Sequence, residues 1–161
     1  MAFGQGLDVT VVQVASAFCS LVNGGTYYRP SIIQGVLGAN NTLIEQKPEA
    51  LNSSISASTA NQVREMVRIG RYTSFPTIDK AGYYVGGKSG TSQVIKDGQY
   101  ADDETIATYL GYGGSENMSN YVIMVEVSGE HKVFKGSYHA MPIFTDISNW
   151  MLDYLKIQPK G

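Results

Sequence analysis

The sequence predicts a mixed α/β fold of the α+β type, an antiparallel sheet flanked by helices. Three observations support this. Apolar residues recur at helical spacing in three segments, and three consecutive segments rich in β-formers follow one another without a crossover helix. The composition, 43% hydrophobic and 16% charged residues, is that of a globular protein. At 161 residues the chain has the length of one domain, which we expect to span residues 1–161.

The first helix is predicted over residues 10–23 and is expected to be largely buried. Thr10 and Gln13 form a Thr-x-x-Gln capping box ahead of an apolar run. Asn23-Gly24-Gly25 provides the left-handed conformation that ends many helices. The next two elements are short strands around Ile32–Leu37 and Leu43–Gln46, joined by a turn.

A second helix is expected to start at Ser58, a favourable N-cap residue, and to end at Gly70. The apolar residues expected to face inward are Val63, Met66 and Val67. The arginines expected to face water are Arg64 and Arg68.

Three strands are predicted next, over Tyr83–Ile95, Thr105–Tyr112 and Tyr121–Ser128. The last helix begins near Pro142, because proline is tolerated in a first helical turn. Its expected buried stripe consists of Ile143, Ile147, Trp150, Met151 and Tyr154.

Charge and apolar patterning exclude several classes of protein. A formal net charge of −2 gives no electrostatic basis for binding nucleic acid. No apolar run approaches the roughly 20 residues that a membrane-spanning helix needs. The single cysteine, Cys19, rules out an internal disulfide and is expected to be a small core residue.

One segment carries a motif, and it can be interpreted in two ways. Gly82–Ser89 has the spelling G-x-x-x-x-G-K-S of a phosphate-binding loop. Its context argues against a nucleotide site, because no apolar strand precedes Gly82 and the residues after Ser89 are poor helix starters. The alternative is a strand that carries Lys88-Ser89-Gly90-Thr91.

The second interpretation resembles the K-[ST]-G-T element of penicillin-binding proteins and serine β-lactamases. Further matches to class B penicillin-binding proteins follow in the same order along the chain. They are Gly4-Gln5-Gly6-Leu7-Asp8-Val9-Thr10, Asn23-Gly24-Gly25 with Pro30, Val85–Gln93, and Ala140-Met141-Pro142-Ile143-Phe144. The chain therefore resembles the C-terminal half of a class B transpeptidase domain, a peptidoglycan D,D-transpeptidase with a β-lactamase-like fold.

The resemblance implies roles for the residues of this strand. Lys88, Ser89 and Thr91 would belong to the catalytic site, with Lys88 attracting the carboxylate of a stem peptide ending in D-Ala-D-Ala or of a β-lactam. The hydroxyls of Ser89 and Thr91 would bond that carboxylate, and the Thr91 amide would be one oxyanion-hole donor. The substrate-binding residues would be Gly90, Thr91, Ser92 and Gln93, on an edge strand along which the peptide lies.

The nucleophile that this family uses is missing from the chain. No serine is followed by lysine three positions later, and the nearest miss is Ser92 with Lys96. Ser115-Glu116-Asn117 has the spelling of the second family motif, S-x-N, but lies after the Lys-Ser-Gly-Thr strand, so we interpret it as accidental. We therefore expect a fragment, cut just before Gly4, that is inactive alone. A non-catalytic ligand-binding module of the same fold remains the alternative.

The resemblance also implies partners and a location. The missing N-terminal half of the domain would pair with the strand at Tyr121–Ser128, so that in its absence this edge is expected to pair with a second copy. The parent enzyme would act on the outer face of the bacterial cytoplasmic membrane, held by an N-terminal anchor absent here.

No cofactor or metal is predicted. His131 and His139 are eight residues apart without a further ligand at suitable spacing. Asp102-Asp103-Glu104 is interpreted as a solvated loop.

Overall fold

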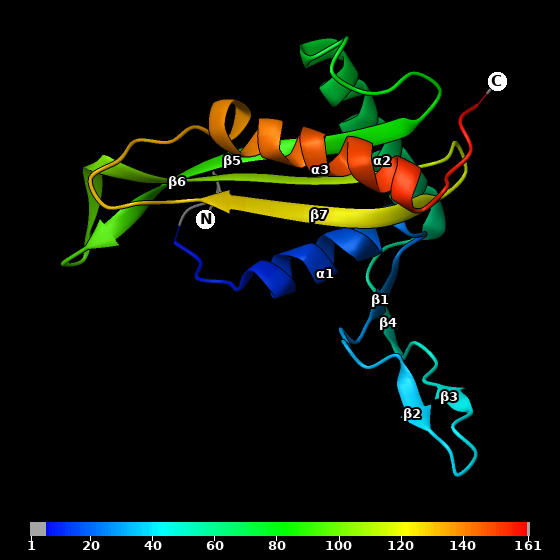
Figure 1. Cartoon of the computed structure of the whole chain (residues 1–161). Helices are drawn as coiled ribbons and strands as arrows, with labels where there is room; N and C mark the ends of the chain where they lie inside the picture. Colours follow the sequence, from blue (N-terminus) through cyan, green and yellow to red (C-terminus); the bar gives the residue numbers. More distant parts are fainter. Residues whose placement is uncertain (1–5, 161) are drawn as a thin grey trace.

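The computed structural model describes residues 6–160 and has the predicted mixed architecture. A three-stranded antiparallel sheet is covered on one face by a C-terminal helix and on the other by an N-terminal helix, while a slender arm projects from one end (Figure 1). The prediction of an antiparallel sheet flanked by helices is confirmed.

Helix α1 spans Val11–Val22 and begins as predicted. The Thr10 side chain accepts a bond from the Gln13 amide, and the Gln13 side chain accepts one from the Thr10 amide. Gly24 and Gly25 both have positive φ after the helix ends. Only the second half of α1 is buried, through Phe18, Ser20 and Val22, so the expectation of a largely buried helix holds for that half alone.

The arm consists of two antiparallel strand pairs. β1 (Thr26–Tyr28) pairs with β4 (Ala50–Ser53) as a stem, and β2 (Gly35–Leu37) pairs with β3 (Leu43–Glu45) as a hairpin at the end. The hairpin was predicted. The stem strands were not, because they are only three and four residues long and pair across more than twenty residues of chain.

Helix α2 spans Ala57–Ser74 and differs from the prediction at both ends. Its N-cap is Ser56, whose hydroxyl accepts a bond from the Thr59 amide, and not Ser58. The helix continues through Gly70 because Arg71, in its last turn, is anchored in the core.

The facing of side chains on α2 also corrects the prediction. Met66 is exposed, whereas Arg64 is partly buried and donates to the carbonyls of Ser115 and Glu116. Arg68 forms an ion pair with Glu65 on the same helix.

The sheet has the strand order β5–β6–β7. β5 (Tyr84–Lys96) and β6 (Gln99–Gly114) form a long hairpin, and β7 (Ser119–Val127) returns along the other side of β6. β5 and β7 are therefore the two edges of the sheet within residues 6–160. β7 is an edge as predicted, but its side chains are mostly half-buried.

A π-helical turn, η1 (Gly136–Ala140), leads into α3 (Met141–Tyr154), with Pro142 in its first turn as predicted. The predicted buried stripe is wrong for most of its members, because Ile143, Ile147, Trp150 and Tyr154 are exposed. The residues of α3 that pack on the sheet are Met141, Phe144, Thr145, Ser148 and Leu152.

The core lies on both faces of the sheet. On the α3 face it contains Val85, Tyr109, Val125, Phe144 and Leu152, and on the α1 face Phe18, Val22 and Tyr112. Within residues 6–160, every helix is too short or too polar to cross a bilayer.

Candidate functional site

The candidate site lies along β5, where the predicted residues Lys88 to Gln93 form the middle of a continuous strand. This strand contradicts the phosphate-binding interpretation of Gly82–Ser89. Such a loop needs a turn and then a helix start at the Lys-Ser pair, whereas Gly86 to Ser89 pair with residues 109–112 of β6 in regular register.

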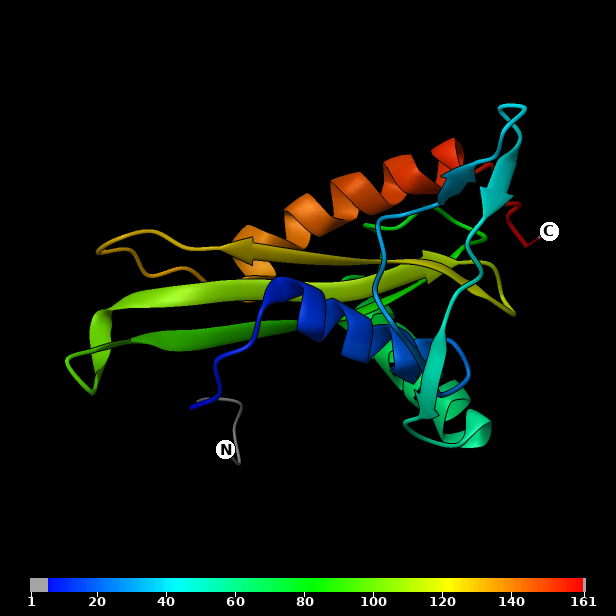
Figure 2. The same cartoon turned by 90° about the horizontal axis from the view of Figure 1, so that it is seen from below.

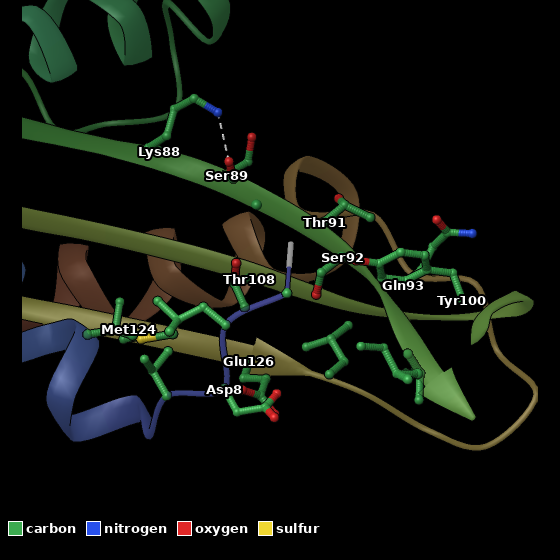
Figure 3. A pocket seen from close by; sticks show the side chains of 18 residues that line it. Asp8, Lys88, Ser89, Thr91, Ser92, Gln93, Tyr100, Thr108, Met124 and Glu126 are labelled. Atoms are coloured by element: carbon green, nitrogen blue, oxygen red, sulfur yellow. Dashed lines mark hydrogen bonds between the residues drawn. The ribbon is translucent and has the colours of Figure 1, made fainter. Parts of the chain in front are cut away.

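A groove of about 990 Å³ runs beside this strand (Figure 3). All six residues predicted for the site line it, together with residues from the segment before α1, from β6 and from β7. Those further residues include Asp8, Tyr100, Thr108, Met124 and Glu126. Sequence reasoning did not identify them, because strand pairing brings them to β5 from distant parts of the chain.

Strand alternation divides the six residues between two faces of the sheet. Lys88, Gly90 and Ser92 lie opposite Leu110, Thr108 and Ile106, on the face that α1 covers. Ser89, Thr91 and Gln93 lie on the α3 face. The two sets of side chains meet only at the outer edge of β5, so this edge is where Lys88 and the hydroxyls can act together.

The Lys88 side chain bends around the outer edge of β5. Its ammonium donates to the Ser89 carbonyl at 2.8 Å, and both side chains project away from β6 (Figure 3). Lys88 is exposed and forms no ion pair with any carboxylate of residues 6–160. Its charge is therefore available to a ligand at the edge.

The main chain of β5 is open on the same side. The Ser89 carbonyl that meets Lys88 points away from β6, and main-chain groups alternate in direction along an antiparallel strand. The Thr91 amide therefore also faces the open edge. No strand within residues 6–160 pairs with this edge, so it can accept an added strand.

Thr91 and Gly136 connect the site strand to the start of η1. The Gly136 amide donates to the Thr91 hydroxyl at 3.2 Å, which leaves the hydroxyl proton free for a ligand. A Cβ at Gly136 would lie 2.4 Å from the Gly90 carbonyl oxygen and 2.5 Å from that of Thr108. Only glycine allows this approach, so η1 fixes β5 at the site.

Gln93 is held at the far end of the groove. Its side-chain amide donates to the Ala101 carbonyl at 3.1 Å, at the start of β6. Across the groove from Lys88, the carboxylates of Asp8 and Glu126 also line it (Figure 3). The groove thus has a cationic edge and an acidic opposite side.

A buried arginine of α2 stabilises β6, the strand that pairs with β5. Arg71 pairs with Asp79, and its guanidinium also donates to the hydroxyls of Tyr109 and Thr145 at 2.8 and 2.9 Å. Burial raises the pKa of Tyr109, so its hydroxyl stays neutral. No sequence signal identified Arg71, because a helical arginine is normally expected to face solvent.

The remaining candidates lie elsewhere. Glu116, in the Ser115-Glu116-Asn117 turn, accepts bonds from Tyr84 and Lys160 at the other end of β5. Asp102–Glu104 lie within β6 and not in a loop. Asp103 bonds His131 at 2.7 Å, and Cys19 is half-buried, where burial raises the pKa of its thiol.

Residues 6–160 contain no group of three or more His, Cys, Asp or Glu side chains placed to hold a metal ion. The first match of the resemblance, Gly4 to Thr10, is described only from Gly6 on, because Gly4 and Gln5 lie outside the described residues.

Comparison with known families gives one match that covers most of the chain. The model of the penicillin binding protein transpeptidase domain matches residues 1–149. Stage V sporulation protein D of Bacillus subtilis is 32% identical over 163 residues, which cover 99% of this chain and 25% of that protein. PbpB of Mycolicibacterium smegmatis, a penicillin-binding protein, is 30% identical over 94% of this chain and 25% of its own length.

Solved structures show the same similarity. Penicillin binding protein 3 of Mycobacterium tuberculosis, complexed with aztreonam, has a TM-score of 0.78 and 28% identity, covering 98% of this chain and 38% of that one. The transpeptidase domain of Burkholderia pseudomallei penicillin-binding protein 3 shares the fold, with a TM-score of 0.77 and 24% identity over 99% of this chain and 46% of its own. The chain spans about a quarter of the length of the curated relatives named above.

Proposed function

Because the chain belongs to the penicillin binding protein transpeptidase family, we propose that its β5 edge and groove bind the acyl-donor peptide of a peptidoglycan D,D-transpeptidase. One observation carries this proposal. Judged over residues 6–160, the open edge of β5 presents a lysine without an ion-pair partner, two hydroxyls and main-chain groups that no strand pairs, within four consecutive residues. An extended peptide with a free carboxylate fits such an edge, because strand addition satisfies its main chain and Lys88 attracts its terminal charge.

Each residue of the motif then has a role. Lys88 supplies the positive charge at the edge and belongs to the catalytic site. The hydroxyls of Ser89 and Thr91 donate to the carboxylate of a D-Ala-D-Ala peptide or a β-lactam. The outward-facing Thr91 amide provides one of two oxyanion-hole donors. Gly90, Ser92 and Gln93 form the wall along which the substrate lies.

The attacking group comes from outside these residues. Acyl transfer in this family needs the serine of S-x-x-K, and the 161 residues contain no such sequence. We therefore expect the chain alone to bind without reacting, as a non-catalytic module of the same fold would. Removing a nucleophile costs several orders of magnitude in rate, and half of an oxyanion hole cannot replace it.

We infer that the complementary half of the domain adds at the outer edge of β7. β7 ends the sheet, and this chain covers 46% of a relative's chain described as a transpeptidase domain. Without that half, the pairing of two chains through β7 stays a prediction.

The relatives support a role in cell-wall synthesis. One is described as a probable peptidoglycan D,D-transpeptidase of Neisseria flavescens. By analogy, the parent protein would cross-link stem peptides on the outer face of the cytoplasmic membrane, held by an anchor outside this chain.

The test compares two forms of one ligand. An N-acetylated peptide ending in D-Ala-D-Ala is titrated into the chain as the free acid and as the C-terminal amide, with heat as the readout. The acid should bind about tenfold more tightly, because only the acid can use Lys88. Lys88→Gln should abolish this difference, and Lys132→Gln, another exposed lysine, should preserve it. Equal binding of acid and amide to the unaltered chain would contradict the proposal.

A further inference from the structure

The hairpin β2–β3 at the end of the arm exposes four large apolar side chains. It projects away from the three-stranded sheet (Figures 1 and 2). β2 and β3 pack on each other, and no element beyond the arm makes more than a marginal contact with them among residues 6–160. A two-stranded hairpin of this kind is at best marginally stable in water.

Both faces of this hairpin are apolar. Val36 pairs with Ile44 on one face, and Leu37 pairs with Leu43 on the other. All four side chains are exposed, Val36 by 63% and Leu37 by 68%, and Ile32 just before β2 is fully exposed. A hairpin that is apolar on both faces has no polar face to turn toward solvent. Its surface therefore resembles those that are buried in protein assemblies.

The segment from Pro30 to Ile44, which contains all of β2, carries no charge. Residues 30–44 contain no Asp, Glu, Lys, Arg or His. Natural edge strands are usually protected from pairing by charged residues, above all Lys, or by Pro. β3 has such protection, because Glu45 ends it and Lys47 and Pro48 follow, whereas β2 has none within residues 31–38.

We propose that the outer edge of β2 pairs with β2 of a second copy of this chain, which joins two hairpins into a four-stranded antiparallel sheet. A two-fold contact of this kind brings identical surfaces together, and a charge-free strand meets its own copy without repulsion. The pairing satisfies the open main chain of both β2 strands and raises the strand number above the two that are marginal alone.

Two other occupants fit less well. An anionic membrane surface would require basic residues, and residues 30–44 have none. Insertion into a bilayer would place an apolar tip first, whereas the tip, Gly38-Ala39-Asn40-Asn41-Thr42, is mostly polar. The contact is also separate from the β7 edge, which lies in the main sheet.

The test uses the whole chain and two measurements. Sedimentation over a hundredfold concentration range should show a reversible dimer. Hydrogen exchange at the two ends of that range should show at least tenfold slower exchange of the residues 31–38 amides at high concentration, a signal separate from any protection of the β7 edge at residues 119–127. Val36→Lys places a charge on the exposed hairpin without touching the core, and should remove the protection of residues 31–38 and any dimer that forms through them. Met66→Lys, at a similarly exposed position on α2, should leave both unchanged.

The proposal is overturned by any of three results. The chain sediments as a monomer at all concentrations, the residues 31–38 amides gain no protection at high concentration, or the Val36→Lys variant keeps that protection.

Discussion

The hydroxyl of Tyr109 accepts a bond from the buried guanidinium of Arg71, and Tyr109 lies directly opposite Ser89 in the β5–β6 pairing. A charged residue of α2 is thereby connected to the strand that carries the candidate site. The same guanidinium bonds Asp79 and Thr145, so that one side chain ties α2, the loop after it, β6 and α3 together.

Arg71→Met should destabilise the fold by about 3–5 kcal/mol, because it leaves Asp79 without its partner and removes the support of Tyr109. Equilibrium unfolding in urea measures this cost. Arg68→Met, one turn earlier on the same helix, is the matched control and should cost at most about 1 kcal/mol, since its ion pair with Glu65 is partly exposed. Equal costs for the two variants would show that Arg71 is not an anchor.

Gly136→Ala should displace β5 at the site. The new methyl group would clash with the carbonyls of Gly90 and Thr108, and such overpacking typically costs about 1–3 kcal/mol. Gly70→Ala is the control. It lies inside α2 with nothing within 4 Å of its added methyl, so it should stabilise the chain by about 0.5–1 kcal/mol. The prediction fails if both substitutions change stability in the same direction.

Glu104 should contribute to acid sensitivity. Hydrogen bonds from the Lys96 ammonium and then from the His131 amide lower the pKa of this carboxyl. A lowered pKa gives stability that is present above the unfolded value, roughly 4.3, and lost as the pH falls through the folded value. The difference in melting temperature between the unaltered chain and Glu104→Gln should be larger at pH 7 than at pH 3. A gap that persists undiminished at pH 3 would contradict this.

The sequence predicted those elements whose signals are local. The Thr10–Gln13 capping box fixed the start of α1, and the β-formers around Lys88 indicated the strand that the structure contains. The stripe on α3 was assigned to the wrong face because Thr145 and Ser148 are polar and yet buried. Thr145 bonds Arg71 and Ser148 bonds Tyr121, and both partners come from distant parts of the chain.

Only the consecutive residues of the site could be predicted from the sequence. The motif from Lys88 to Gln93 could be found by inspection, because its residues are consecutive. Neither Gly136, which holds Thr91, nor Glu126, across the groove, could be found in this way, because only the pairing of β5, β6 and β7 brings them near the motif.

The chain alone should not react with a β-lactam. After incubation with excess benzylpenicillin, its intact mass should equal that of the untreated protein, because no S-x-x-K serine is present. A stoichiometric adduct that survives denaturation would show that another residue acts as the nucleophile.

The most direct test of the binding surface is a nuclear magnetic resonance titration with the D-Ala-D-Ala peptide. Saturable shifts are expected for the backbone amides of Ser89, Thr91 and Gln93, and the C-terminal amide of the same peptide should need about tenfold higher concentration to produce them. Shifts confined to other strands, or half-saturation at the same concentration with both peptides, would contradict a carboxylate-binding edge on β5.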